Sequence, residues 1–184
     1  MCLSKVAKEK PRMQKWQRKE IQAKRAIEDQ GFVVHDANVL FGTNCPNIDL
    51  VVYARTGAIY VQVKSSEKPA GKNSVVVDGS PWNTEQLLGN APIYNKHDHY
   101  QAHFVVIVDR LKTGATEFYI APPAALEELS RKRASEYANR PKRDGTQRSI
   151  KFRKELPREA LQPWLRAWHL LGHPPFTSSQ PSEY

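Results

Sequence analysis

Short apolar runs alternate with polar, turn-forming residues along most of this chain, and their lengths are those of β-strands. Two of the runs, Ile48–Ala54 and Ala58–Ser65, flank the turn Arg55-Thr56-Gly57 and predict a hairpin. Runs of similar composition predict further strands at Phe32–His35, Phe104–Asp109 and Thr116–Ala121. The pattern therefore predicts a protein whose centre is a β-sheet.

Helical spacing of apolar residues is found in three other stretches. The first runs from Met13 to Gln30 and ends at Gly31, and the second runs from Ala124 to about Ala138. The third is Pro157–Leu171, where one helix face would collect the core residues Leu161, Trp164, Leu165, Trp168 and Leu171. Weaker patterns predict a short helix at Thr84–Leu88 and short strands at Val75–Val77 and Ser149–Arg153.

The order of these elements predicts an α/β fold, a sandwich in which helices flank a central mixed sheet. A hairpin cannot be parallel, so an all-parallel Rossmann sheet is disfavoured, and no GxGxxG or GxxxxGK[ST] motif is present. We expect residues 1–12 to be a flexible basic lead-in, residues 13–172 to form one domain, and residues 173–184 to be a disordered tail.

The positive charge of the chain is unevenly distributed, because the net charge of +9 is concentrated in two segments. Residues 1–25 carry a balance of +7 and residues 131–154 a balance of +8, which leaves the rest of the chain negative. Such segments favour a polyanionic partner, and they equally suit a solubilising or disordered basic arm. The two cysteines predict no disulfide framework, and no run approaches the ~18 apolar residues of a membrane span. We therefore expect a cytoplasmic protein without a membrane segment.

Three polar residues interrupt the hairpin strands at positions that the pattern would otherwise bury: Asp49, Gln62 and Lys64. Burying such groups costs several kcal/mol unless they meet each other, a metal or a ligand. If Ala54 and Gly57 close the turn, the numbers of paired residues sum to 111. Asp49 then lies opposite Gln62 and on the same face as Lys64, which makes the three a candidate site.

Oxygen donors at these positions match the chemistry of a hard divalent cation. Mg²⁺ prefers oxygen ligands and keeps several waters. Asp49 offers a carboxylate, Gln62 an amide oxygen and Val63 its backbone carbonyl, while Glu20 on the first helix could approach from above the sheet. Lys64 could position or deprotonate an attacking water, or neutralise charge on a phosphate. The site would suit Mg²⁺ or Mn²⁺.

The combination of a helix carrying Glu20, the strand Ile48-Asp49-Leu50-Val51 and the strand Val61-Gln62-Val63-Lys64-Ser65 resembles the PD-(D/E)XK nuclease superfamily. It is similar to archaeal Holliday junction resolvases and to Mrr-type restriction endonucleases, which often carry Gln-x-Lys. The resemblance implies a restriction-endonuclease-like sandwich that hydrolyses DNA, with Asp49 and Gln62 as metal ligands, Lys64 as the catalytic lysine and Glu20 as the helix carboxylate. It also allows a homodimer, because many such nucleases cut both strands as dimers.

Phosphate contacts would come from hydroxyl groups beside the hairpin and from the basic segments. The candidates for nucleic-acid binding are Lys15, Arg18, Lys19, Ser65, Ser66, Arg140, Lys142, Arg143, Arg148 and Lys151. The leading hypothesis is thus a metal-dependent DNA endonuclease. Because Gln62 is neutral, a catalytically inactive DNA-binding module on the same fold is the second hypothesis. A protein-interaction role, such as an immunity partner that docks on an acidic protein, is the third.

Overall fold

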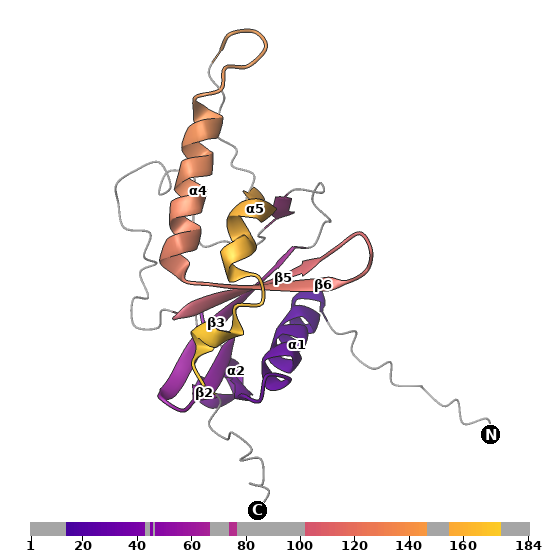
Figure 1. Cartoon of the computed structure of the whole chain (residues 1–184), viewed down its shortest axis with the longest axis vertical. Helices are drawn as coiled ribbons and strands as arrows, with labels where there is room; N and C mark the ends of the chain where they lie inside the picture. The colour runs from indigo at the N-terminus through magenta and orange to yellow at the C-terminus, as the bar shows by residue number, and fades with distance from the viewer. Residues whose placement is uncertain are drawn as a thin grey trace, which may run out of the picture.

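The computed structural model describes residues 14–42, 45, 47–66, 74–76, 102–146 and 155–173, and a five-stranded sheet lies at its centre (Figure 1). The strands stand in the order β1-β2-β3-β5-β6. Their bounds are Val33–Asp36 for β1, Leu50–Ala54 for β2, Gly57–Ser66 for β3, Phe104–Arg110 for β5 and Thr116–Ala121 for β6. β3 and β5 are parallel and the other pairs are antiparallel, so the predicted mixed sheet flanked by helices is confirmed.

The hairpin register is the one that the sequence predicts. Ala54 pairs with Gly57 and Leu50 pairs with Val61, which gives the sum of 111 throughout the ladder. Gly57 has φ of +130°, a backbone conformation that side chains disfavour, and this accounts for glycine at the end of the turn. The two-residue turn and the period-2 alternation of apolar residues thus fix which side chains share a face.

Helix α1 (Lys15–Glu28) covers one face of the sheet. Its residues Ala23 and Ile27 are fully buried against Leu50, Val52 and Val61. Gly31 follows the helix with φ of +87°, as its predicted role as a helix stop requires.

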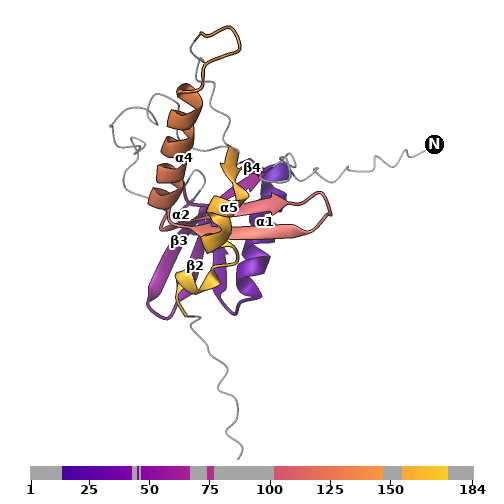
Figure 2. The same cartoon turned by 45° about the horizontal axis from the view of Figure 1, so that its top comes forward.

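The other face of the sheet is covered at β5 and β6 by the base of α4 (Pro123–Ala138) and by α5 (Arg158–Leu161). A second, two-stranded sheet joins β4 (Ser74–Val76) to β7 (Glu155–Pro157) on this side. Figures 1 and 2 show α4 projecting away from the sheet, with the turn that follows it at its outer end.

The predicted closing helix Pro157–Leu171 is wrong. The segment forms α5, then the 3₁₀ turns η1 (Gln162–Trp164) and η2 (Trp168–Leu171). Leu165 bridges to Tyr119, and the N–H of Arg166, which has φ of +51°, donates to the carbonyl of Phe118 at 2.8 Å. The segment passes beside the edge strand β6 from one face of the sheet to the other, so the five expected core residues fall into two separate clusters.

A short helix was also missed. The sequence pattern leaves the chain irregular between His35 and Asn47, but residues Ala37–Phe41 form α2. The predicted elements at Thr84–Leu88 and Ser149–Arg153 lie outside the described residues, as do the lead-in 1–12 and most of the tail. Among the residues that the structure describes, no helix combines the length and apolar character that a membrane span requires.

Candidate active site

Asp49 lies at the point where β3 continues beyond its partner β2. The β2–β3 ladder begins at Leu50, whereas β3 extends to Ser66. The N–H of Asp49 donates to the carbonyl of Val61 at 2.9 Å, and its Oδ2 accepts from the N–H of Val63 at 2.6 Å. Asp49 therefore bonds to the residues on both sides of Gln62, and its carboxylate is held along the uncovered part of β3.

The carboxylate of Asp49 is held in an environment that does not favour its charge. Burial raises its pKa, the hydrogen bond from Val63 and the charge of Lys64 lower it, and the charge of Asp36 raises it again. The net result is a pKa above the ordinary value. A positive charge added here would relieve this cost, because it favours the ionised carboxylate.

Glu20 belongs to the same electrostatic group. On α1, Glu20 precedes the buried Ala23 by three residues and the buried Ile27 by seven. This spacing places it on the face of the helix that meets the sheet. Burial raises its pKa to about 7, with smaller contributions from the charges of Asp49 and Asp36. The structure thus brings Glu20 and Asp49 into one electrostatic neighbourhood.

Gln62 and Lys64 leave β3 on the face away from α1, because the alternate residues Val61 and Val63 pack in the core beneath that helix. Gln62 is 8% exposed, and its Nε2 donates to Oδ1 of Asn47 at 3.4 Å. Lys64 is half-buried and its charge acts on Asp49. Glu20 therefore stands on the α1 side of the sheet, where the charge of Asp49 acts on it, and Gln62 and Lys64 leave β3 on the opposite side.

The backbone carbonyl of Val63, which the sequence suggests as a metal ligand, faces the same side of β3 as Asp49. The N–H and C=O groups of a strand residue point to the same side of the strand. Since the N–H of Val63 points to Asp49, its carbonyl also faces the side that β2 leaves uncovered.

Asp36 is a neighbour that sequence reasoning missed. It is the last residue of β1 and pairs with Leu50, directly beside Asp49. Its Oδ1 accepts from the N–H of Asn38 at 2.8 Å and caps α2, while its charge raises the pKa of both Glu20 and Asp49. In a sequence, an acidic residue directly after a strand is weak evidence for a functional site, since such residues commonly serve as helix caps.

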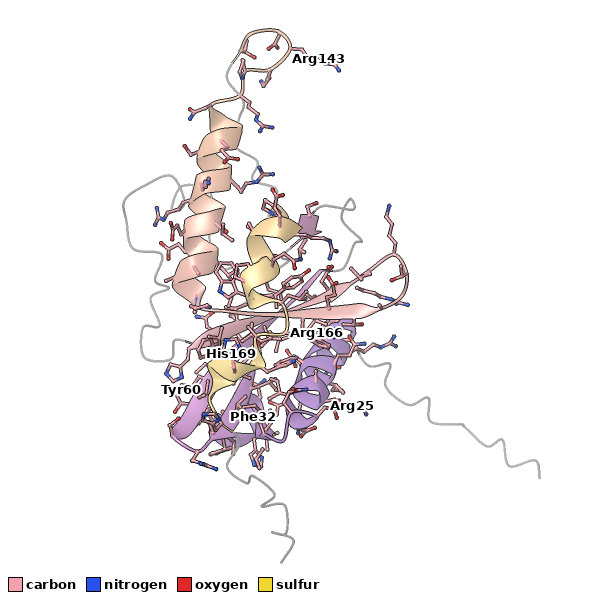
Figure 3. The ribbon with its side chains drawn as sticks, in the orientation of Figure 1. Arg25, Phe32, Tyr60, Arg143, Arg166 and His169 are labelled. Atoms are coloured by element: carbon pink, nitrogen blue, oxygen red, sulfur yellow. The ribbon has the colours of Figure 1, made fainter. Side chains whose placement is uncertain are left out.

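The candidate phosphate contacts are divided between separate places. Arg18 is exposed and Lys19 is half-buried on α1, and Ser65 is half-buried directly after Lys64. The exposed residues Arg140, Lys142 and Arg143 follow α4 in the chain, and Figure 3 shows Arg143 at the outer end of this helix, away from α1. The side chains of Lys15 and Ser66, and the whole of Arg148 and Lys151, lie outside the description.

A ready-made metal site built from side chains alone is not found in the described part of the chain. No three His, Cys, Asp or Glu residues there are grouped so that they could hold a metal ion. A cation at Asp49 would need the amide of Gln62, a backbone carbonyl and water as additional donors. This donor set suits Mg²⁺, which binds one or two carboxylates and keeps several waters.

No protein-family model matches the chain, and no curated protein matches it in sequence. The solved structure of a bacterial homing endonuclease, I-Ssp6803I, aligns with 87% of this chain and 92% of its own length. The sequence identity is 19% and the TM-score is 0.42, so this likeness assigns neither a family nor an activity to the chain.

Proposed function

We propose that this chain is an endonuclease that hydrolyses phosphodiester bonds in DNA with the help of Mg²⁺ or Mn²⁺, on a restriction-endonuclease-like fold. The observation that carries the proposal is the carboxylate of Asp49, fixed by the amide of Val63 beside the charge of Lys64. A structural carboxylate would be expected to have its charge compensated, whereas Asp49 and Glu20 both have a raised pKa.

The residues present fit a divalent cation. Asp49 would hold it through a carboxylate oxygen, with the carbonyl of Val63 and the amide oxygen of Gln62 on the same stretch of β3. The Nε2 of Gln62 is engaged by Asn47, which leaves the amide oxygen as the atom to offer. Glu20 would complete the site directly or through water. When bound, the cation supplies positive charge that stabilises the developing charge on the phosphate and lowers the pKa of a coordinated water.

The protein's own side chains contribute two further functions. Lys64 carries a positive charge that can stabilise the phosphate oxygens as negative charge develops on them. Glu20 exchanges a proton near neutral pH in the metal-free protein, because its pKa is about 7. A cation bound nearby would lower this pKa, so in the loaded site Glu20 would act as a charged carboxylate that holds the cation or a water.

The test is cleavage of plasmid, linear and branched DNA in Mg²⁺, Mn²⁺ and EDTA. We expect metal-dependent cleavage that falls by about 10³-fold in Asp49→Asn and in Lys64→Met, the loss typical of a group that stabilises the transition state. Glu28→Gln, which removes the charge of an exposed acid on α1, is the control for the loss of a charge and should cut like the native chain. Absence of metal-dependent cleavage, or equal cleavage by Asp49→Asn, would exclude the nuclease.

A second function is favoured by one observation, the neutral Gln62 in a site with few carboxylates. A chain that binds DNA through its basic segments without cutting it would show salt-dependent affinity that survives Asp49→Asn. Titration calorimetry with Mg²⁺ separates the two functions, since only the nuclease requires a cation at Asp49.

A further inference from the structure

Three consecutive apolar residues on α2 face solvent. Val39 is 79% exposed, Leu40 is 42% exposed and Phe41 is 50% exposed. Single exposed apolar residues are common on protein surfaces, whereas contiguous exposed apolar patches are often binding sites. Val39, Leu40 and Phe41 are called the apolar knuckle below.

The apolar knuckle is joined rigidly to the candidate active site. Asp36 caps α2, and the N–H of the fully buried Ala37 donates to the carbonyl of Asp49 at 3.0 Å. At about 1.5 Å of rise per residue, the five residues of α2 end ~7.5 Å beyond Asp36. Along the axis of a DNA duplex this length corresponds to roughly two base steps of ~3.4 Å each.

A row of rings supports the knuckle from below. Phe41 meets Tyr60 edge to face, with ring centroids 6.1 Å apart, and Tyr60 stacks on His103 at 5.2 Å. Tyr60 and His103 are also tied by their backbones, because the N–H of His103 donates to the carbonyl of Tyr60 at 2.8 Å. Tyr60, labelled in Figure 3, lies two residues before Gln62 on β3, so the two side chains leave the strand on the same face.

We propose that the apolar knuckle is a wedge that packs against the bases of DNA beside the scissile phosphate and opens the base step there. The proposal rests on the proposed nuclease function, because a phosphate held at Asp49 brings the adjoining nucleotides onto α2. Three apolar side chains offer nothing to a phosphate, whereas base faces and unstacked base steps accept such residues well.

The experiment places 2-aminopurine, a fluorescent base that brightens when unstacked, at each of the steps around the cleavage site of a duplex. The variants are Val39→Ser and Phe41→Ala, and the control is Val33→Ser. Val33 is 38% exposed on the same strand as Asp36 but at its other end. Val39→Ser keeps the test sound if Phe41→Ala disturbs Tyr60, because Val39 is mostly free of protein contacts.

We expect the native chain and the control to brighten 2-aminopurine within about two steps of the cut. Both wedge variants should lose most of this signal and bind the duplex about tenfold more weakly. Unchanged fluorescence and affinity in the two variants, with cleavage intact, would overturn the wedge but leave the nuclease standing. A change of sedimentation behaviour in Val39→Ser with unaltered DNA binding would assign the knuckle to a second copy of the chain. A native chain that neither binds nor cuts DNA would overturn both proposals.

Discussion

Two groups of partly or fully buried charged side chains lie on or against the same sheet, and they differ in how their charge is compensated. In the first group, Arg158 from α5 forms ion pairs with Asp109 on β5 and with Glu117 on β6, the latter at 2.7 Å. The hydroxyl of Tyr119 donates to the same oxygen of Glu117 at 2.7 Å. Burial lowers the pKa of Arg158, but the neighbouring negative charges outweigh it and leave the pKa above its ordinary value.

The second group is the candidate active site, which is short of positive charge. Burial and the charges of Asp49 and Asp36 raise the pKa of Glu20. Burial and the charge of Asp36 raise the pKa of Asp49, and Lys64 offsets this only in part. The first group thus supplies its own counter-charge from an arginine that is 17% exposed, whereas the second would gain from a cation that comes from outside.

A perturbed pKa alone does not separate the two groups. Burial and the hydrogen bond to Glu117 raise the pKa of Tyr119 well above its ordinary value, although Tyr119 is part of the compensated group. The separating feature is the charge balance around the perturbed residue. Buried ion pairs with their partners in place are a common structural device, while carboxylates whose charge is offset only in part are candidates for a functional site.

The largest effect on stability that this comparison predicts is for Arg158→Met. Removal of the guanidinium leaves Asp109, which is fully buried, without its counter-charge. We expect the free energy of unfolding to fall by about 3–5 kcal/mol, the usual result of breaking a buried pair on one side. Urea unfolding followed by circular dichroism measures it, and addition of Asp109→Leu to the variant should recover much of the loss.

Arg131→Met is the matched control for this substitution. Arg131 pairs with Glu127 at 2.8 Å on α4, but its side chain is 29% exposed and the pair lies within one helix. Such a pair contributes at most ~1 kcal/mol. A cost for Arg158→Met no greater than that for Arg131→Met would mean that the two charge groups do not differ as proposed.

The hairpin and its polar residues could be predicted from sequence, and the compensated group could not. The register followed from a two-residue turn and a period-2 pattern, both of which are local. Asp49, Gln62 and Lys64 stood out because they interrupt apolar runs. Arg158 and Asp109 are 49 residues apart, and neither position is unusual in its own segment.

The closing helix shows why local spacing can mislead. Leu161 and Leu171 are buried, as the helical pattern predicts, but they belong to clusters on opposite faces of the sheet. Pro163 cannot donate a backbone hydrogen bond, which favours an interruption at that point. The path beside the edge of β6 is set by the sheet itself, and no residue of the segment encodes it.

In EDTA, the stability of the chain should depend on pH through Glu20. Glu20 has a pKa of about 7 in the folded chain and an ordinary value of 4.5 when unfolded, so between these values the folded state binds more protons. Stability contributed by this group is therefore lost as pH rises from about 4.5 to about 7. Glu20→Gln should be more stable than the native chain by about 1–2 kcal/mol at pH 8, with allowance for solvent screening of a half-buried group.

At pH 4.5 the same substitution should change stability little, because the native side chain is then largely protonated in the folded state. Thermal unfolding across the pH range measures this difference, and Glu28→Gln, on the exposed side of the helix, should show no such trend. If the difference in stability between Glu20→Gln and the native chain were the same at every pH, Glu20 would not be part of the acid-rich group. Saturating Mg²⁺ should make the native chain more stable than Glu20→Gln at pH 8, since the cation favours the charged carboxylate.

The smallest effect expected is that of Asp36→Asn, and it isolates charge from structure. Asparagine caps a helix about as well as aspartate, so α2 should begin at the same residue and the free energy of unfolding should change by only a few tenths of a kcal/mol. The pKa of Glu20 should nevertheless fall below about 7, because one of the charges that raise it is gone. NMR titration of the Glu20 carboxyl carbon measures the change, with Asp29→Asn, just beyond the end of α1, as control. An unaltered Glu20 pKa would remove Asp36 from the site and leave Asp49 as its only acidic neighbour among the described residues, which is the group that sequence reasoning first proposed.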